Sequence, residues 1–217
     1  SEVNHGYQAI VWHTASGPVT WSFIGTSDGD NQTVATDINE LQVIVGRRFD
    51  HIDLNKPDPK DDFVVFYSFG TGPPQFTHGE GMCYSVGDVV RLTDRIAINN
   101  DNWMVGSHKV GGVCRAVRFQ SSQPPGLLAG TSTTERSHAY DVNDLGVIVG
   151  ENAHRPVVWT PDGELIELPM MGYSAGQARG VNNANEIVGA VYSGGGERVP
   201  VLWRVDTSFT IPPGPNP

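Results

Sequence analysis

Two short pairs of histidine and carboxylate are the residues of this sequence best placed to do chemistry. His51 and Asp53 are two positions apart, and so are His78 and Glu80. In an extended segment, residues i and i+2 face the same way, so each pair would present two side chains together. His78 and Glu80 would suit an acid and a base acting on a substrate, whereas all four residues would suit a metal site. The alternative is a pair of polar loops with solvent-exposed side chains.

The cofactor is not defined by these residues, although a divalent metal such as calcium or zinc fits their chemistry. The chain also has two cysteines, Cys83 and Cys114. They could form one disulfide bridge in an oxidising compartment, or remain two buried thiols. A free Cys83, five residues after His78, would be a candidate nucleophile, and a bridge would remove that possibility.

Composition narrows the classes of partner and of fold. The net charge of −10 and the pI near 5.0 argue against a nucleic-acid partner, which requires clustered Lys and Arg. No apolar run approaches the ~18 residues of a membrane-spanning helix, so we expect no membrane span. With 26 Gly and 15 Pro in 217 residues, and no long helix-period pattern, the chain predicts many short strands joined by tight turns.

An internal repeat sets the architecture that must position any site. In each copy an Asn is followed seven residues later by a Gly, with apolar residues on both sides. The copies are ATDINELQVIVG (35–46), RIAINNDNWMVG (95–106), AYDVNDLGVIVG (139–150) and ARGVNNANEIVG (178–189). We interpret each copy as a β-hairpin whose Asn begins the turn and whose second strand ends at the Gly.

The turn of this hairpin needs a residue with positive φ three positions after the Asn. Asn102, Gly146 and Asn185 suit that conformation, but Gln42 does not, so the first turn should be strained or differently shaped. The repeated Asn side chain can bond to backbone N–H groups of its own turn. We therefore assign the four asparagines to the architecture and not to catalysis.

A second recurring piece is an extended segment with an aromatic residue near its end. These aromatics are interpreted as packing between repeat units and not as a ligand cage, because large rings at repeated strand positions usually fill the space between sheets. The five segments are QAIVWHT (8–14), DFVVFYS (62–68), CRAVRFQ (114–120), RPVVWTP (155–161) and VPVLWRV (199–205), with the aromatics Trp12, Phe66, Phe119, Trp159 and Trp203.

About four short strands in ~40 to 45 residues is the period of a propeller blade. The sequence therefore predicts an all-β chain: a single domain over residues 1–217, a β-propeller of about five short four-stranded blades. One blade would be incomplete or closed by strands from the chain ends. Four blades are the alternative, and a β-sandwich or a solenoid of the same repeats also fits. An insertion at 47–94 interrupts one unit.

The pattern Ala-x-x-Ile/Val-Asn, a turn, Ile/Val-Val-Gly and then Ala-x-x-Trp resembles the HAF-repeat family of bacterial extracellular proteins. The resemblance runs from YQAIVW at 7–12 to VPVLWRV at 199–205, and it departs at 47–94 and at Arg118 and Phe119, where the family has Leu-Trp. It implies a propeller-like fold and an extracellular or cell-surface location. No catalytic residue can be carried over, since the family is defined by its scaffold.

Three charged residues just before the Asn turns are the candidate binding residues. If their strands are innermost, Asp37, Asp141 and Arg179 would line a central channel. We expect a secreted, monomeric module that binds a small molecule, a glycan or another polymer through this channel and the 47–94 insertion. The alternatives are a hydrolase or lyase that uses the insertion, with or without a metal, and a structural or protein-interaction module, which predicts an exposed apolar patch.

Overall fold

The computed structural model describes residues 9–13, 20–24, 31–50, 63–68, 75–77, 96–120 and 125–205, and it places strands but no helix among them. This confirms the all-β prediction for the described part of the chain. Contacts divide the chain into two compact units, Ser1–Ile96 and Ala97–Pro217. The single domain over 1–217 therefore stays a prediction.

The first unit holds two antiparallel sheets. Strands β5 and β6 lie inside the predicted insertion 47–94 and complete the second of these sheets, so part of that segment belongs to the repeat. The first sheet consists of β1 (Ala9–His13) and β2 (Thr20–Ile24). The second, sheet B, consists of β3 (Asn31–Ile38), β4 (Val43–Asp50), β5 (Phe63–Ser68) and β6 (Gln75–Thr77).

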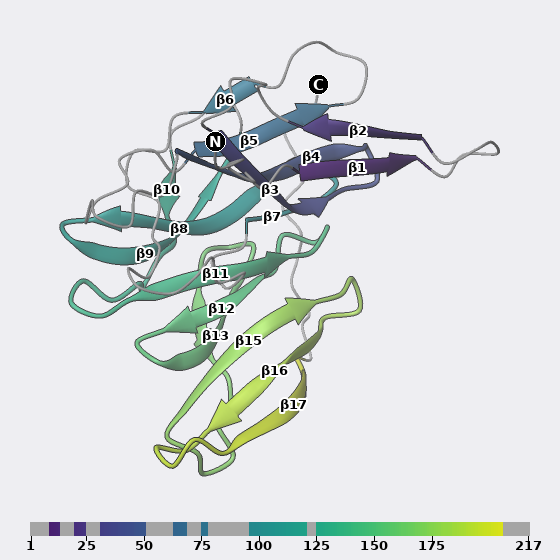
Figure 1. Ribbon diagram of the computed structural model, residues 1–217. Coiled ribbons are helices and arrows are strands. Elements are labelled where there is room, and N and C mark those ends of the chain that lie inside the picture. The colour runs from purple at the N-terminus through teal and green to yellow at the C-terminus, as the bar shows by residue number, and fades with distance from the viewer. Residues whose placement is uncertain are drawn as a thin grey trace. The chain divides into compact units, whose positions relative to one another are not determined.

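The second unit holds three antiparallel sheets stacked face to face, drawn from teal to yellow in Figure 1. In each sheet the strands follow one another in chain order. Sheet C consists of β7 (Ala97–Ile98), β8 (Met104–Val110), β9 (Val113–Phe119) and β10 (Gly126–Leu127). Sheet D consists of β11 (Ser137–Val142), β12 (Ile148–Asn152), β13 (Arg155–Trp159) and β14 (Leu165–Glu167), and sheet E of β15 (Ala175–Val181), β16 (Glu186–Tyr192) and β17 (Arg198–Arg204).

The Asn turns take the predicted conformation, including the one that departs in sequence. The third residue after the Asn has φ of 62° at Gln42, 60° at Asn102, 77° at Gly146 and 58° at Asn185. The Gln42 turn keeps the same shape as the others, with Asn39 N–H bonded to Val43 O at 3.1 Å. Gln42 therefore adopts a positive φ, which is unfavourable for a residue other than Gly. Of the two expected outcomes, a strained turn and a differently shaped turn, the structure has the strained turn.

The repeated Asn also joins one sheet to the next. Asn143 Oδ1 accepts hydrogen bonds from Leu145 N at 3.1 Å and Val147 N at 2.9 Å within its own turn. Its Nδ2 donates to Asn182 O in the following turn at 2.9 Å, and Asn99 Nδ2 donates to Asn143 O at 3.1 Å. One side chain thus closes a hairpin and fixes the position of its neighbour.

Asp144 adds a second set of bonds between the same turns. Its carboxylate accepts bonds from Asn100 N at 2.9 Å and Asn183 Nδ2 at 2.8 Å. The backbone bond from Asn100, followed by the bond from Asn183, lowers the pKa of Asp144 below its ordinary value of 3.8. The charged form is the one that these turns stabilise.

The repeat Gly is required by the packing of the aromatic residue on the next strand of the same sheet. A β-bulge at Tyr140 shifts the register of β11 against β12, opposite Gly150. A Cβ at Gly150 would collide with the carbonyl oxygen of His138 and lie 2.9 Å from the ring of Trp159. Gly189 has the same relation to Trp203, at 2.8 Å from its ring. Gly therefore leaves the space in which each Trp packs.

Two apolar cores lie between the sheets of the second unit. Trp159 is 1% exposed in the core between sheets C and D, and Trp203 is 4% exposed in the core between D and E. Phe119 is also buried, so the packing role predicted for the aromatics holds for these three. The side chains of Trp12 and Phe66 lie outside the described residues.

We expect Asn143→Ala to lower the free energy of unfolding by about 2 to 3 kcal/mol, because it removes several buried hydrogen bonds at once. Asn143 is 4% exposed and bonds to two turns. The matched control is Asn182→Ala, where the side chain is exposed and bonds to Glu186 of its own sheet, with an expected loss of about 1 kcal/mol. Urea unfolding measures both, and equal losses would contradict the link between sheets.

Gly150→Ala should lower the free energy of unfolding by about 3 kcal/mol or more, because the added methyl has no space against His138 O and Trp159. Gly194→Ala is the control, since a Cβ there meets nothing within 4 Å. Its effect should stay within about 0.5 kcal/mol. Thermal unfolding followed by circular dichroism distinguishes the two, and a mild effect at Gly150 would contradict the packing described.

Candidate functional site

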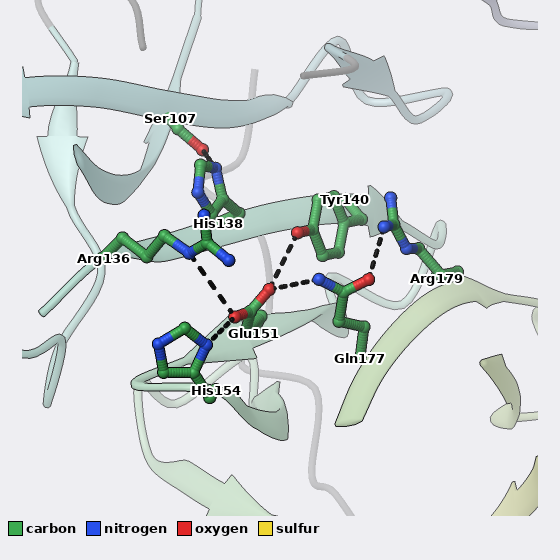
Figure 2. Close-up of polar contacts among 8 residues, drawn as sticks. All are labelled: Ser107, Arg136, His138, Tyr140, Glu151, His154, Gln177 and Arg179. Carbon is green, nitrogen blue, oxygen red and sulfur yellow. Dashed lines mark hydrogen bonds and ion pairs between the residues drawn. The ribbon is translucent and has the colours of Figure 1, made fainter. Parts of the chain in front are cut away.

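Residues that depart from the repeat are better candidates for function than residues that recur in it. The position directly after the repeat Gly is Arg47, Ser107, Glu151 and Ala190 in the four copies. Glu151 is fully buried, at 0% exposure, although buried carboxylates are rare unless paired. Figure 2 shows the polar side chains that gather around it.

These side chains come from both sheets D and E and from the turn between β12 and β13. Tyr140 lies on β11, Glu151 on β12 and Gln177 on β15, so stacking of the two sheets brings them together. The two-residue turn Ala153–His154 adds His154, with φ of 50° and 64° at residues other than Gly. Strained backbone of this kind is often found at functional sites.

The strained turn is held by backbone hydrogen bonds on both sides. Ala153 N donates to Arg136 O at 3.0 Å, and His154 O accepts from Gly176 N at 2.9 Å. These bonds fix the imidazole of His154 next to Glu151 and keep Arg136 close to the same carboxylate. The arrangement is rigid at the backbone level.

The two oxygens of Glu151 have different neighbours. Oε2 accepts hydrogen bonds from Tyr140 Oη at 3.1 Å and from Gln177 Nε2. Oε1 accepts no hydrogen bond from the described residues, but it lies 3.2 Å from His154 Nδ1 and 3.8 Å from Arg136 Nε (Figure 2). A charge buried this deeply is destabilising unless it is compensated, and Arg136 places an opposite charge beside it.

The site continues along the strand that follows. Arg179 donates to Gln177 Oε1, and its guanidinium lies over the ring of Tyr140 at 4.2 Å from the centroid. Tyr140 and Arg179 occupy the bulge position of their respective strands, so this cation–π contact joins equivalent points of two repeats.

A smaller polar link occupies the equivalent place between sheets C and D. Ser107 Oγ lies 2.7 Å from His138 Nδ1, and both groups are buried. Ser107 stands at the repeat position of Glu151, and His138 stands at that of Gln177. The Glu151 cluster between sheets D and E therefore occupies the repeat positions at which sheets C and D have the simpler Ser107–His138 contact.

Arg136 and His154 are the most exposed members of the cluster. Their side chains are 50% and 51% exposed, while the carboxylate that orients them is fully buried. His154 directs Nδ1 at Glu151, which leaves Nε2 for another partner. Two side chains with N–H groups thus lie half exposed beside one buried carboxylate.

The charge of Glu151 affects the pKa of Tyr192, at the end of β16. Burial raises the pKa of the Tyr192 hydroxyl above its ordinary value of 10.0, and the negative charge of Glu151 raises it further. Arg136, Arg179 and Arg198 act in the opposite direction. The phenol consequently stays neutral at physiological pH.

Of the three predicted binding residues, the structure gives Asp141 a clear packing role. Its Oδ2 accepts a hydrogen bond from Val181 N on β15 at 2.9 Å, which joins sheets D and E. Arg179 is engaged with Tyr140 and Gln177, and Asp37 Oδ1 accepts from Ile38 N at 2.9 Å. A channel lined by the three stays a prediction.

The candidates in the insertion lie outside the described residues. This applies to His51, Asp53, His78, Glu80 and Cys83. Within the part of the chain that the structure does describe, no group of three or more His, Cys, Asp or Glu could hold a metal ion, and no helix could cross a membrane. Cys114 carries no free thiol, and its pairing with Cys83 stays a prediction.

The sequence patterns did not point to Arg136, Glu151 or His154 as site residues. A signal was present, because an acidic residue after the repeat Gly occurs in only one of the four copies. Which side chains would surround that acidic residue could not be predicted without knowing how the sheets stack.

Comparisons with known proteins add no family. No protein-family model matches the chain, and a search of curated proteins finds no match. The resemblance to HAF repeats therefore remains a proposal that depends on the repeat residues alone.

We expect Glu151→Gln to lower the pKa of Tyr192 relative to the unmodified chain, because the negative charge that helps to raise it is removed. NMR titration of ring-labelled tyrosine measures this, with Tyr192→Phe to assign the signal. Glu167→Gln is the control, since Glu167 is half exposed and pairs with Arg155. An unchanged pKa in Glu151→Gln would contradict the contribution of Glu151 to the Tyr192 shift.

Proposed function

We propose that this chain is a ligand-binding module, secreted or displayed at the cell surface, whose ligand is a glycan. The observation that supports this proposal is the pair of half-exposed donors, Arg136 and His154, fixed by the fully buried Glu151. Donors that are already ordered lose little entropy on binding, so they suit recognition of a polar ligand.

The chemistry of the donors favours a sugar among polar ligands. Guanidinium and imidazole groups are planar and present directed N–H donors, which match the closely spaced hydroxyls of a sugar ring. Tyr192 stays neutral near this group and adds an aromatic ring of the kind on which a sugar face packs. A polymer of such sugars would extend along the ends of neighbouring sheets.

The scaffold proposed for this module is a stack of repeat sheets of the HAF type. A propeller of about five blades, or of four, requires every sheet to be covered by another sheet of the chain. A solenoid of the same repeats leaves the last sheet open.

A hydrolase or lyase is the second candidate, and the Glu151–His154 pair supports it. A buried carboxylate that orients an imidazole through Nδ1 leaves Nε2 able to act as a general base. The candidate acid and base of the insertion, His78 and Glu80, remain proposals for the same activity.

The test is to incubate the purified chain with a panel of bacterial and plant polysaccharides and to measure both protein retention and chain length. Retention without shortening supports the binding module. Shortened chains, detected by mass spectrometry, support the enzyme. Neither retention nor shortening would contradict a glycan ligand.

For a polysaccharide that retains the chain, we expect Arg136→Ala and His154→Asn each to weaken binding about tenfold, or ~1.4 kcal/mol. Asn is chosen at 154 because it tolerates the positive φ of that turn. Arg204→Ala is the control, since Arg204 is 74% exposed and also pairs with one carboxylate, Glu186. Isothermal titration calorimetry measures the three, and equal affinities would place the ligand elsewhere.

A further inference from the structure

Three arginines lie near Tyr192, beside the Glu151 cluster. Arg198 is the cross-strand partner of Tyr192 at the start of β17, and its Cζ lies 5.7 Å from the centroid of the Tyr192 ring. Arg136, Arg179 and Arg198 each act to lower the pKa of the Tyr192 hydroxyl, so their three positive charges converge there. These three side chains are named here the arginine group.

Little negative charge balances the arginine group. Among the described residues, Glu151 is the one carboxylate that raises the pKa of Tyr192, and it is fully buried. Arginines elsewhere on sheets D and E have a carboxylate partner at the surface, as Arg155 has Glu167 and Arg204 has Glu186, each pair at 3.1 Å. The region around Tyr192 therefore carries a net positive charge.

Two members of the arginine group are oriented by uncharged partners. Arg179 lies over the ring of Tyr140 and donates a hydrogen bond to Gln177 (Figure 2), and the exposed Arg198 lies beside the ring of Tyr192. A guanidinium has five N–H donors, and an aromatic ring or a single acceptor engages few of them. These side chains can therefore bind a further acceptor while they keep their full charge.

The repeat does not require an arginine at position 179. The equivalent residues of the other three copies are Thr36, Ile96 and Tyr140. The scaffold thus forms with a hydroxyl, an aliphatic or an aromatic side chain at this position. A cation occurs only in the copy that lies next to Glu151 and Tyr192, which associates it with this site and not with the architecture.

We propose that the glycan bound at this site is acidic, with carboxylate or sulfate groups on its sugar units, and that the arginine group recognises those groups. This inference rests on the glycan-binding function proposed above and names the class of sugar. A guanidinium binds a carboxylate through two parallel N–H bonds, and it binds the oxygens of a tetrahedral anion in a similar way. A neutral sugar would leave the charge of the arginine group without a counterpart.

The overall charge of the chain makes such a site easy to recognise in an experiment. With a net charge of −10, the chain as a whole repels a polyanion. Charges in solution are screened beyond about 8 Å at physiological ionic strength, so a local positive group can still attract an acidic ligand that reaches it. Retention of an acidic glycan would consequently indicate a specific site and not general ion exchange.

The test measures affinity of the full chain for charged polymers and their neutral counterparts. Polygalacturonate is compared with its fully methyl-esterified form, and dextran sulfate is compared with dextran. We expect at least one charged polymer to bind about tenfold or more tightly than its counterpart, and to lose about tenfold in affinity between ~0.05 M and ~0.5 M NaCl. The polymer that binds shows whether the recognised group is carboxylate or sulfate.

Variants then locate the charge that matters. Arg198→Gln and Arg136→Gln should each weaken binding of that polymer by about fivefold, as the loss of one exposed ionic contact predicts. Arg204→Gln is the matched control, because it removes the same charge from an exposed position on the strand of Arg198. It should change affinity less than about twofold.

Three results would overturn the proposal. Equal affinity for a charged polymer and its neutral counterpart, or retention by neutral glycans alone, would refute the acidic ligand and leave the glycan-binding function standing. Binding to none of these polymers and to no glycan of the wider panel would refute both. An equal loss in Arg204→Gln and Arg198→Gln would show that total charge, and not the arginine group, controls binding.

Discussion

The asparagine that begins each repeat turn is the constraint on which the described architecture depends. Its side-chain oxygen closes the hairpin, and in Asn99 and Asn143 the amide nitrogen bonds to the next turn. Only an amide provides an acceptor and a donor in one short planar group. A Ser or Asp could cap the turn, but neither could also donate across to the next carbonyl in this geometry.

The Asn hydrogen bonds between turns fix how the sheets stack, and the stacked sheets enclose the apolar cores. With the turns aligned, the bulge and the repeat Gly leave room for Trp159 and Trp203 to pack between sheets. Each indole also donates a hydrogen bond, Trp159 to Ala129 O and Trp203 to Pro169 O, both at 2.9 Å. The aromatic core is therefore oriented as well as filled, which explains why the ring recurs at one strand position.

The Glu151 cluster shows how a repeat scaffold can acquire a specific site. A simple polar contact between sheets, Ser107 with His138, is replaced at the next interface by a buried carboxylate beside Arg136 and His154. Burial of that charge is costly, so its partners are held in fixed positions and two of them reach the surface. In sheet E the same position is Ala190. One repeat position thus changes from a simple polar contact to a candidate binding site.

The sequence by itself determined the strands, the turns and their conformation. The Asn-to-Gly spacing gave the four hairpins, the positive φ at the third turn residue and the burial of Trp159, because each depends on short-range backbone sterics and on local hydrogen bonding. What only the tertiary structure decided is which side chains meet across sheets. Glu151 is 26 residues from Gln177 and 15 from Arg136, and no local pattern connects them. Their proximity is set by the stacking of sheets, which depends on packing between repeats and not on the sequence of any one of them.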